Sequence, residues 1–259
     1  MSERLSTGLR DYLLGESSMR KALEDCVMKI YSGAAPASAN DAVTGVLLAI
    51  ITKSSGTVSS GERSTPGRWQ ITIPDSHAEG ATVKAAINIG AAGAVTYTYT
   101  NTPDAGTAEQ VMAKVAQMLN DIYGISAIYL GSTIQARTVV IQGRIAGEDI
   151  DVVDGAGTIT ITPTEIEVAA RLDAIYFANP SSGAMSKASE TWSGLIATSG
   201  VAGYFRFVTS SDDGTLSTTQ VRAQGSVSTS GAELNLSNTS LVAATTLTID
   251  TYSISLPAE

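Results

Sequence analysis

The last third of the chain alternates apolar and polar residues over short segments. FRFVTSS (205–211), TTQVRAQGSV (218–227), ELNLSN (233–238) and TTLTIDTYSISL (245–256) follow this period of two and are separated by Gly, Ser, Asp or Asn. Alternation turns one set of side chains toward a core and the other toward solvent, as in an antiparallel sheet. We therefore predict an all-β region over residues 201–257, in which Asp-Gly within SSDDGT (210–215) marks a hairpin.

The N-terminal residues show helical spacing on both sides of Gly15. One face collects Leu5, Leu9, Tyr12 and Leu13, and a second face collects Met19, Leu23 and Val27. This pattern predicts two short helices that form an amphipathic arm over residues 1–26. The arm packs on its own domain or reaches a neighbour. In the second case the partner interface would use Leu5, Leu9, Arg10, Tyr12 and Leu13.

The segment between this arm and the last third contains two different patterns. Residues 28–31 read as a strand, and VLLAIIT (46–52) is a continuous apolar run that predicts a strand buried on both faces. After the linker-like KSSGTVSSG (53–61), an α+β pattern follows. Its helix, with Thr107 as N-cap, is expected over residues 107–123, and its strands over 68–74, 82–89, 94–100, 126–130, 138–145, 150–153 and 158–162. A further strand is expected over residues 172–177.

These elements predict a mainly β chain with an insertion. The β-sandwich domain, of jelly-roll type, would comprise residues 27–54 and 169–259, with an inserted α+β domain at residues 55–168. Residues 27–52 alone supply too few strands to close a sheet, which favours insertion over three domains in series. The linker would suit one of the two closely spaced ends that an insertion requires.

Composition narrows the classes of function. Charged residues make up 16% of the 259 residues, the net charge is −9 and no basic run exists, which argues against a nucleic-acid surface. The single cysteine, Cys26, rules out an internal disulfide and is expected to be buried. No apolar run is long enough to span a membrane or to serve as a secretory signal, so we expect folding in a reducing cytoplasm.

Candidate chemistry is sparse. The one histidine, His77, lies in the polar turn PDSHAEG between Asp75 and Glu79, and a metal site would need further convergent ligands. No G-x-S-x-G elbow accompanies it. The acidic GEDIDVVDG (147–155) lacks the spacing of an EF-hand and reads as a solvated strand edge or a weak surface cation site. We expect no catalytic residue, no cofactor and no metal, and hence no enzyme.

Several segments resemble a family of structural proteins of tailed bacteriophages and prophages. The resemblance lies in TGLRDYLLG (7–15), IYSGAAPASANDAVTG (30–45), SKASETWSG (186–194), GVAGYFRF (200–207) and the segment 225–257. In that family an aromatic–Arg–aromatic element such as Tyr204–Arg206 is a strand and not a site. The middle part, VTYTYTNTPDAGTAEQVMAKVAQMLN with Ala146–Gly147 further on, is similar to a β-β-α-β-β module inserted in phage head and tail proteins.

The resemblance implies a non-enzymatic virion component that is made in the cytoplasm of a bacterial host. Within the virion we expect a capsid decoration or cement protein that bridges subunits of the major capsid protein or other virion proteins. It would act as a homo-oligomer, a dimer or a trimer, without nucleic-acid or membrane partners. The alternatives are a tail or head–tail connector subunit and a module that binds host glycans.

Overall fold

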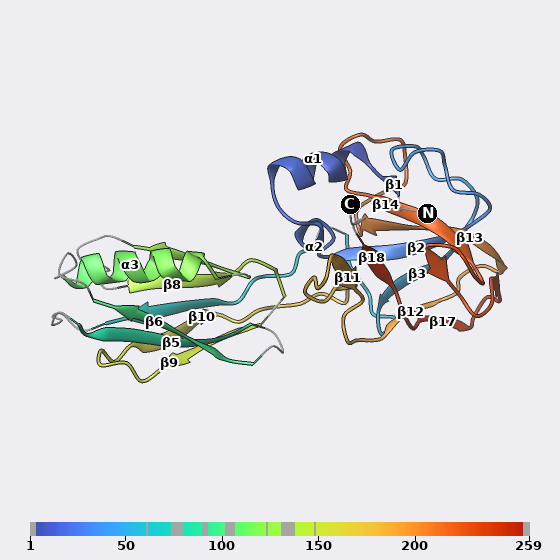
Figure 1. Cartoon of the computed structure of the whole chain (residues 1–259). Coiled ribbons are helices and arrows are strands. Elements are labelled where there is room, and N and C mark those ends of the chain that lie inside the picture. The colour runs from blue at the N-terminus through green and yellow to red at the C-terminus, as the bar shows by residue number, and fades with distance from the viewer. Residues whose placement is uncertain are drawn as a thin grey trace. The chain divides into compact units, whose positions relative to one another are not determined.

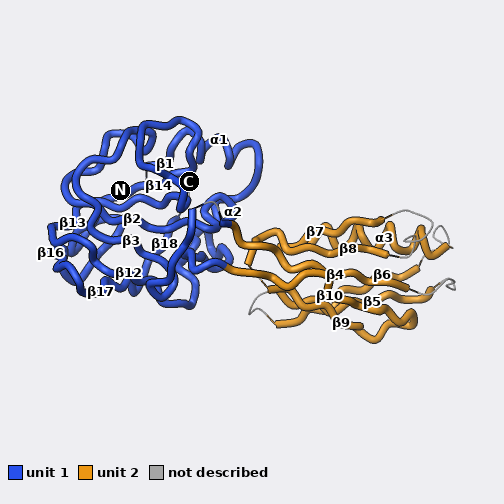
Figure 2. Tube along the Cα trace, turned by 180° about the vertical axis from the view of Figure 1, so that it is seen from behind, with its two compact units in different colours: residues 1–62, 172–259 blue, residues 63–171 orange. Residues whose placement is uncertain are grey.

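The computed structural model describes residues 4–60, 62–73, 80–89, 93–101, 107–122, 124–130, 138–147 and 149–255. The chain divides into two compact units (Figure 2): unit 1 is residues 1–62 and 172–259, and unit 2 is residues 63–171. Each unit has its own hydrophobic core. The described part is mainly β with several antiparallel sheets, as the alternating pattern predicts.

Unit 1 contains most of the strands (Figure 1). Its elements are β1 (Arg4–Leu5), α1 (Thr7–Gly15), α2 (Met19–Ala22), β2 (Cys26–Ser32), β3 (Leu47–Lys53), β11 (Ala184–Ser186), β12 (Trp192–Leu195), β13 (Gly200–Thr209), β14 (Ala223–Ser228), β15 (Leu234–Asn235), β16 (Ser240–Leu241), β17 (Thr246–Ile249) and β18 (Ser253–Ser255). The main sheet has the order β1-β14-β13-β2-β3-β12-β17, with β15 beside β14 and β16 beside β13. A second sheet pairs β11 with β18, and the jelly-roll strand order stays a prediction.

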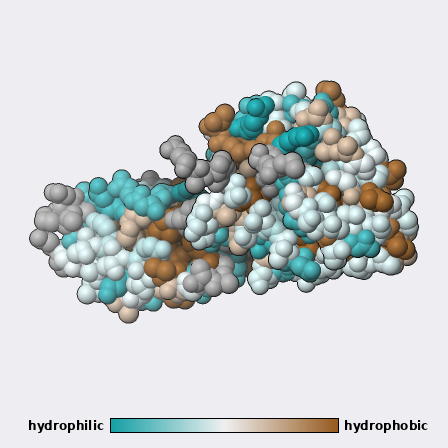
Figure 3. Space-filling model, turned by 45° about the vertical axis from the view of Figure 1, so that its right-hand side comes forward, coloured by the Kyte–Doolittle hydropathy of each residue, from teal (hydrophilic) through white to brown (hydrophobic). Residues whose placement is uncertain are grey.

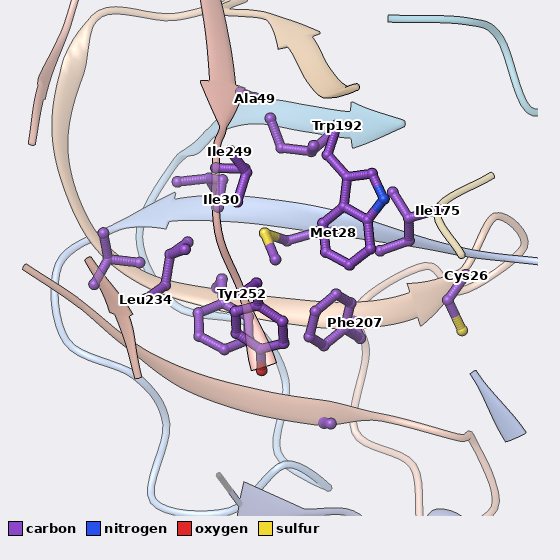
Figure 4. Close-up of a cluster of buried hydrophobic side chains, with 14 of the residues drawn as sticks. Cys26, Met28, Ile30, Ala49, Ile175, Trp192, Phe207, Leu234, Ile249 and Tyr252 are labelled. Carbon is purple, nitrogen blue, oxygen red and sulfur yellow. The ribbon is translucent and has the colours of Figure 1, made fainter. Parts of the chain in front are cut away.

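The core of unit 1 is built around a cluster of aromatic side chains on one face of the main sheet (Figure 4). Phe205 and Phe207 lie two residues apart on one face of β13 and point into this cluster. Trp192 is fully buried there. The rings of Phe177 and Trp192 meet edge to face, with centroids 5.2 Å apart. Such aromatic pairs add roughly 0.5–1.5 kcal/mol to the free energy that their burial provides.

The N-terminal helices pack on unit 1 itself. The Ser6 hydroxyl caps α1 by accepting from the backbone N–H of Leu9, and Leu9 and Leu23 are fully buried in the core. The predicted second helix ends at Ala22, earlier than its apolar spacing suggested. Asp25 has a φ of 60°, which breaks the helix, so the chain enters β2 directly. Cys26 is buried, as expected, although it lies in this strand and not in a helix.

The described residues of unit 2 form two sheets and one helix. Its elements are β4 (Arg68–Thr72), β5 (Thr82–Ile89), β6 (Val95–Thr100), α3 (Ala108–Asn120), β7 (Ile125–Tyr129), β8 (Thr138–Gly143), β9 (Ile150–Asp154) and β10 (Thr162–Glu167). The sheets have the orders β10-β4-β8-β7 and β6-β5-β9. Thr107 and Gln110 form a capping box at the start of α3, which confirms the predicted N-cap.

Two predicted strands are not regular strands. Residues 158–161 contribute only an isolated parallel bridge between Ile159 and Val83, and β10 begins at Thr162. Residues 172–177 form no strand either, apart from an isolated bridge at Phe177. Their apolar residues are buried because the segment runs along the start of β2, where the backbone N–H of Ile175 donates to the Cys26 carbonyl oxygen (3.0 Å).

The two crossings between the units lie close together within each unit. In unit 2 the backbones of Thr65 and Ala170 exchange two hydrogen bonds, of 2.8 and 3.2 Å. In unit 1 the backbone N–H of Lys53 donates to the Asp173 carbonyl oxygen (2.8 Å). Unit 2 therefore interrupts unit 1 as an insertion whose two ends are adjacent in both units.

Candidate functional site

The face of the main sheet opposite the aromatic core is polar, yet it is buried. Along β13, Tyr204 and Arg206 alternate with the core phenylalanines and have no exposed surface. The loop of residues 33–46 bonds to Tyr204 and Arg206 through its backbone, and the loop of residues 210–221 supplies Asp212, which bonds to Arg222. We call the side chains beneath these loops the polar layer; its members are Lys29, Tyr31, Tyr204, Arg206, Asp212, Arg222 and Gln224.

Arg206 occupies the centre of the polar layer. Its Nε and Nη2 donate to Oε1 of Gln224 (3.1 and 2.6 Å), and its Nη1 donates to the backbone carbonyl oxygen of Asp41 (3.1 Å). Gln224 in turn donates from Nε2 to the carbonyl oxygen of Pro36 (2.8 Å). Burial, and next the nearby Arg222 charge, lower the pKa of Arg206, and the hydrogen bonds compensate for part of its desolvation.

Arg222 and Asp212 form a buried ion pair beside it. The guanidinium Nε and Nη2 donate to the two carboxylate oxygens over 2.6 and 2.9 Å, and both side chains are almost fully buried. Nη1 of Arg222 also reaches the carbonyl oxygen of Asn40 (3.3 Å). Asp212 accepts a further bond from the backbone N–H of Gly214 (2.7 Å), which fixes the turn of the second loop.

The hairpin predicted at SSDDGT is present, but its loop is longer than a tight Asp-Gly turn. β13 and β14 are antiparallel neighbours, but the connection between them runs over residues 210–222. Asp212 turns inward and pairs with Arg222, so its side chain holds this loop against the sheet. Lys29 holds the same loop from β2, where its Nζ donates to the Asp212 carbonyl oxygen (2.7 Å). Burial lowers the pKa of Lys29.

Tyr31 and Tyr204 close the other end of the polar layer. Their rings stack with centroids 4.9 Å apart and an interplanar angle of 11°. The Tyr204 hydroxyl donates to the Thr44 carbonyl oxygen (2.6 Å) and accepts from the Thr44 backbone N–H (3.1 Å), so it pins the first loop. Burial, and next the neighbouring Tyr204, raise the pKa of Tyr31 to about 12.

The polar layer also anchors the N-terminus. The Ser6 hydroxyl donates to the Gln220 carbonyl oxygen (2.7 Å) and accepts from the backbone N–H of Arg222 (3.0 Å). Thr7 exchanges two hydrogen bonds of 2.8 Å with the Asn40 side chain. The start of α1 is thus joined to both loops.

The five residues predicted as a partner interface lie in different environments. Leu9 is fully buried in the core of unit 1 and offers no surface to a partner in this conformation. Leu5, Tyr12 and Leu13 are partly buried and pack against the same core. Only Arg10 is exposed, where it donates to the Thr7 hydroxyl over 3.2 Å. The helical pattern missed Leu14, which is 88% exposed.

Two grooves in unit 1 are large enough for a ligand. One, of about 540 Å³, is lined by polar residues that include Lys187, Glu233 and Asp250, and Tyr252 also lines it. Tyr252 is 6% exposed, which leaves little ring surface for a sugar to stack on. The other, of about 400 Å³, is more apolar and includes Ile50 and Leu195. Figure 3 shows the apolar surface as small separate patches on the visible face.

The candidate metal and catalytic residues do not assemble into a site in the described ranges. His77, with its neighbours Asp75 and Glu79, lies outside them, as does Glu148. Asp151 and Asp154 are exposed on β9, and the described residues contain no group of three or more His, Cys, Asp or Glu that could hold a metal ion. No described helix is long and apolar enough to cross a membrane.

Sequence reasoning identified Arg206 as a strand residue but missed the rest of the polar layer. The available signal was a set of polar residues at inward strand positions, Lys29, Arg206 and Gln224, within otherwise apolar strands. Comparison with known proteins adds no assignment: no protein-family model matches the chain, and the search of curated proteins finds no match.

Proposed function

We propose that the chain is a non-enzymatic structural component of a tailed-phage virion, a capsid decoration protein that bridges neighbouring subunits. The observation that carries this proposal is the polar layer, whose buried charges fix two long loops on a sheet. Tyr204 and Arg206 of the layer lie in one segment that resembles phage structural proteins. The layer donates hydrogen bonds to the backbone of Asn40, Asp41 and Thr44, which lie in another such segment. The resembling segments thus build the platform that presents the loops.

The physical role of such loops is adhesion to a fixed partner. Loops that are already ordered lose little conformational entropy on binding, so even a modest contact area yields net affinity. When many copies bind one shell, their weak contacts sum, and the shell as a whole resists internal pressure better. The net charge of −9 suits basic patches on a capsid and keeps the free protein dispersed before assembly.

The direct test is a cryo-EM map of purified particles that contain this protein, read for its location and copy number. Decoration predicts density repeated over the icosahedral shell, with the loops of unit 1 at the contact. Density confined to one vertex or to the tail, at about six or twelve copies, would assign the protein to a connector ring instead. Absence from the particle would overturn the structural role.

A pair of exposed leucines tests which face makes the contact. Leu216 lies in the second loop and is 70% exposed, whereas Leu195 lies on β12 and is 61% exposed. Leu216→Lys should reduce the occupancy of the protein on particles, because it places a charge in the proposed contact. Leu195→Lys is the matched control and should leave occupancy unchanged. Equal occupancy of both variants would contradict the assignment of the loops.

A further inference from the structure

The open edges of the two sheets in unit 2 differ in how strongly they are blocked against pairing with another strand. An edge strand presents unpaired N–H and C=O groups that can recruit another strand, so proteins block such edges with side chains, charges or proline. At β7 the Asn120 side chain does this: Nδ2 donates to the Ala127 carbonyl oxygen (2.7 Å) and Oδ1 accepts from its N–H (2.9 Å). The amide therefore takes the place of a neighbouring strand.

Two other edges carry the charges and the proline that discourage pairing. β10 contains Pro163 together with Glu165 and Glu167, and within the described ranges it pairs with β4 alone. β9 exposes Asp151 and Asp154. A second strand that approached either edge would meet carboxylates, or a position without a donor.

β6 is the exception. Its sequence, VTYTYT, contains no charge, no proline and no glycine and has high strand propensity. Among the described strands β6 pairs only with β5. Its outward-facing Thr96, Thr98 and Thr100 are exposed, whereas Lys84, on the same face of the neighbouring β5, is only partly exposed. Side chains on β6 are more exposed than those on β5 because β5 has a neighbouring strand on each side and β6 has one on only one side among the described strands.

The register of β6 shows which groups point outward. The backbone N–H of Asn101 donates to the Ala81 carbonyl oxygen (2.7 Å), and Tyr99 lies opposite Val83. Since hydrogen-bonded pairs alternate in an antiparallel ladder, Tyr97 and Tyr99 bond to β5, and Thr96, Thr98 and Thr100 direct their N–H and C=O groups to the open edge.

We propose that β6 is a dimerisation strand that pairs antiparallel with β6 of a second copy of this chain, so that two three-stranded sheets become one of six strands. The register that uses all three outward threonines places Thr98 opposite Thr98, on the two-fold axis, and Thr96 opposite Thr100. It forms about six backbone hydrogen bonds. Tyr97 then faces Tyr99 across the junction, and cross-strand aromatic pairs of this kind are stabilising.

We take the strand that pairs with β6 to come from a second copy of the chain, because β6 is complementary to itself. Two copies with a net charge of −9 repel each other over much of their surface, but β6 meets its own image without any charged side chain in the strand. Antiparallel pairing about a two-fold axis also closes after two copies, which gives a discrete dimer.

This inference gives the contact for the homo-oligomer that the proposed function expects, yet it stands on unit 2 alone. The two can therefore fail separately. A monomeric protein found on capsids would overturn the dimer only, and a dimer that is absent from particles would overturn the virion role only.

The first test is sedimentation velocity on the full chain across a concentration series. The wild type should show a dimer. Thr98→Pro should be monomeric with an unchanged far-ultraviolet circular dichroism spectrum, because the N–H it removes points away from β5. Thr98→Val keeps that N–H and should remain a dimer. A monomeric wild type, or a Thr98→Pro dimer as strong as the wild type, would overturn the proposal.

A charged variant covers the case in which proline disturbs folding. Thr98→Lys keeps the backbone donor and places two like charges opposite each other on the two-fold axis. The variant should fold and be monomeric at moderate ionic strength, and raised salt should partly restore the dimer. A Thr98→Lys protein that dimerises as strongly as the wild type would also overturn the proposal.

Cysteine cross-linking tests the register. Residues in a hydrogen-bonded antiparallel pair have Cα atoms about 5.5 Å apart, within the roughly 4.4–6.8 Å that a disulfide spans. Thr98→Cys should give a covalent dimer on mild oxidation, whereas Thr96→Cys should not, because it lies opposite Thr100. The native Cys26 is buried and gives no background. A cross-link at position 96 and none at 98 would overturn this register.

Discussion

At the scale of single residues, unit 1 contains a buried ion pair on which the stability of the fold should depend strongly. The side chains of Arg222 and Asp212 have almost no exposed surface, whereas the Arg68–Glu167 pair in unit 2 is 3.6 Å apart and 40% exposed on both sides. Exposed pairs contribute little, because water and salt screen them. Removing one partner of a buried pair leaves the other charge without compensation and is strongly destabilising.

Neighbouring aspartates give a matched test of this difference. Asp212→Asn keeps the shape of the side chain but removes the charge that faces Arg222, and should lower the free energy of unfolding of unit 1 by about 3–5 kcal/mol. Asp213→Asn changes an exposed carboxylate one residue away and should leave the unfolding midpoint nearly unchanged. Denaturant titrations in a Trp69→Phe background would let Trp192 report on unit 1 alone. Equal midpoints would contradict a structural role for the ion pair.

Tyr31 predicts a dependence of stability on alkaline pH. Its folded pKa, about 12, lies above the unfolded value of about 10, so its contribution is complete below pH 10. As the pH rises from about 10 to 12, the unfolded state loses this proton while the folded state keeps it, and stability falls. The stability of the wild type relative to Tyr31→Phe should drop by on the order of 2 kcal/mol across this range. A constant difference would show that Tyr31 titrates normally.

At the scale of elements, α1 belongs to the core and presents one apolar side chain to solvent. Leu9 is fully buried, while Leu14, on the same helix, is 88% exposed. Leu9→Ala should destabilise unit 1 by about 2–5 kcal/mol through lost burial and a cavity. Leu14→Ala is the control and should not change the stability measurably. Thermal unfolding of both variants measures the two effects. Two equally mild substitutions would indicate that α1 is a detachable arm.

The sequence predicted elements well where the signal was local. α3 was predictable because its apolar stripe has helical spacing and Thr107 caps its start. Residues 172–177 were wrongly predicted as a strand, since burial of an irregular segment produces the same apolar run. The polar layer was missed because its partners are distant in sequence: Arg206 meets Asp41, and Ser6 meets Arg222. Nothing local signals such pairs.

At the scale of the whole molecule, the chain folds as two units with separate cores, one inserted in the other. Within unit 1, Lys53, which precedes the insertion, bonds to Asp173, which follows it, so the two segments of unit 1 are joined directly. Unit 1 should therefore not need unit 2 to hold its two segments together, apart from the entropy of closing the joining loop.

Excision tests this independence. Replacement of residues 63–171 by a short Gly-Ser linker should leave a folded unit 1. The two segments of unit 1 that flank the gap are already bonded to each other at Lys53 and Asp173, and the core of unit 1 uses no residue of unit 2. The expected result is a cooperative thermal transition reported by Trp192 fluorescence, together with a strand-rich circular dichroism spectrum. A variant without a cooperative transition would show that unit 1 depends on the insertion.

The polar layer holds its first loop almost entirely by main-chain atoms. Arg206, Arg222, Gln224 and Tyr204 end on the carbonyl oxygens of Asp41, Asn40, Pro36 and Thr44. A carbonyl oxygen is present whatever side chain its residue carries. The solvent-facing side chains of this loop can thus diversify, by drift or by a randomised library, while the clamp beneath them persists. Unit 1 would then serve as a display scaffold: the exposed side chains of this loop could be changed while its backbone hydrogen bonds, and with them the fold, are kept.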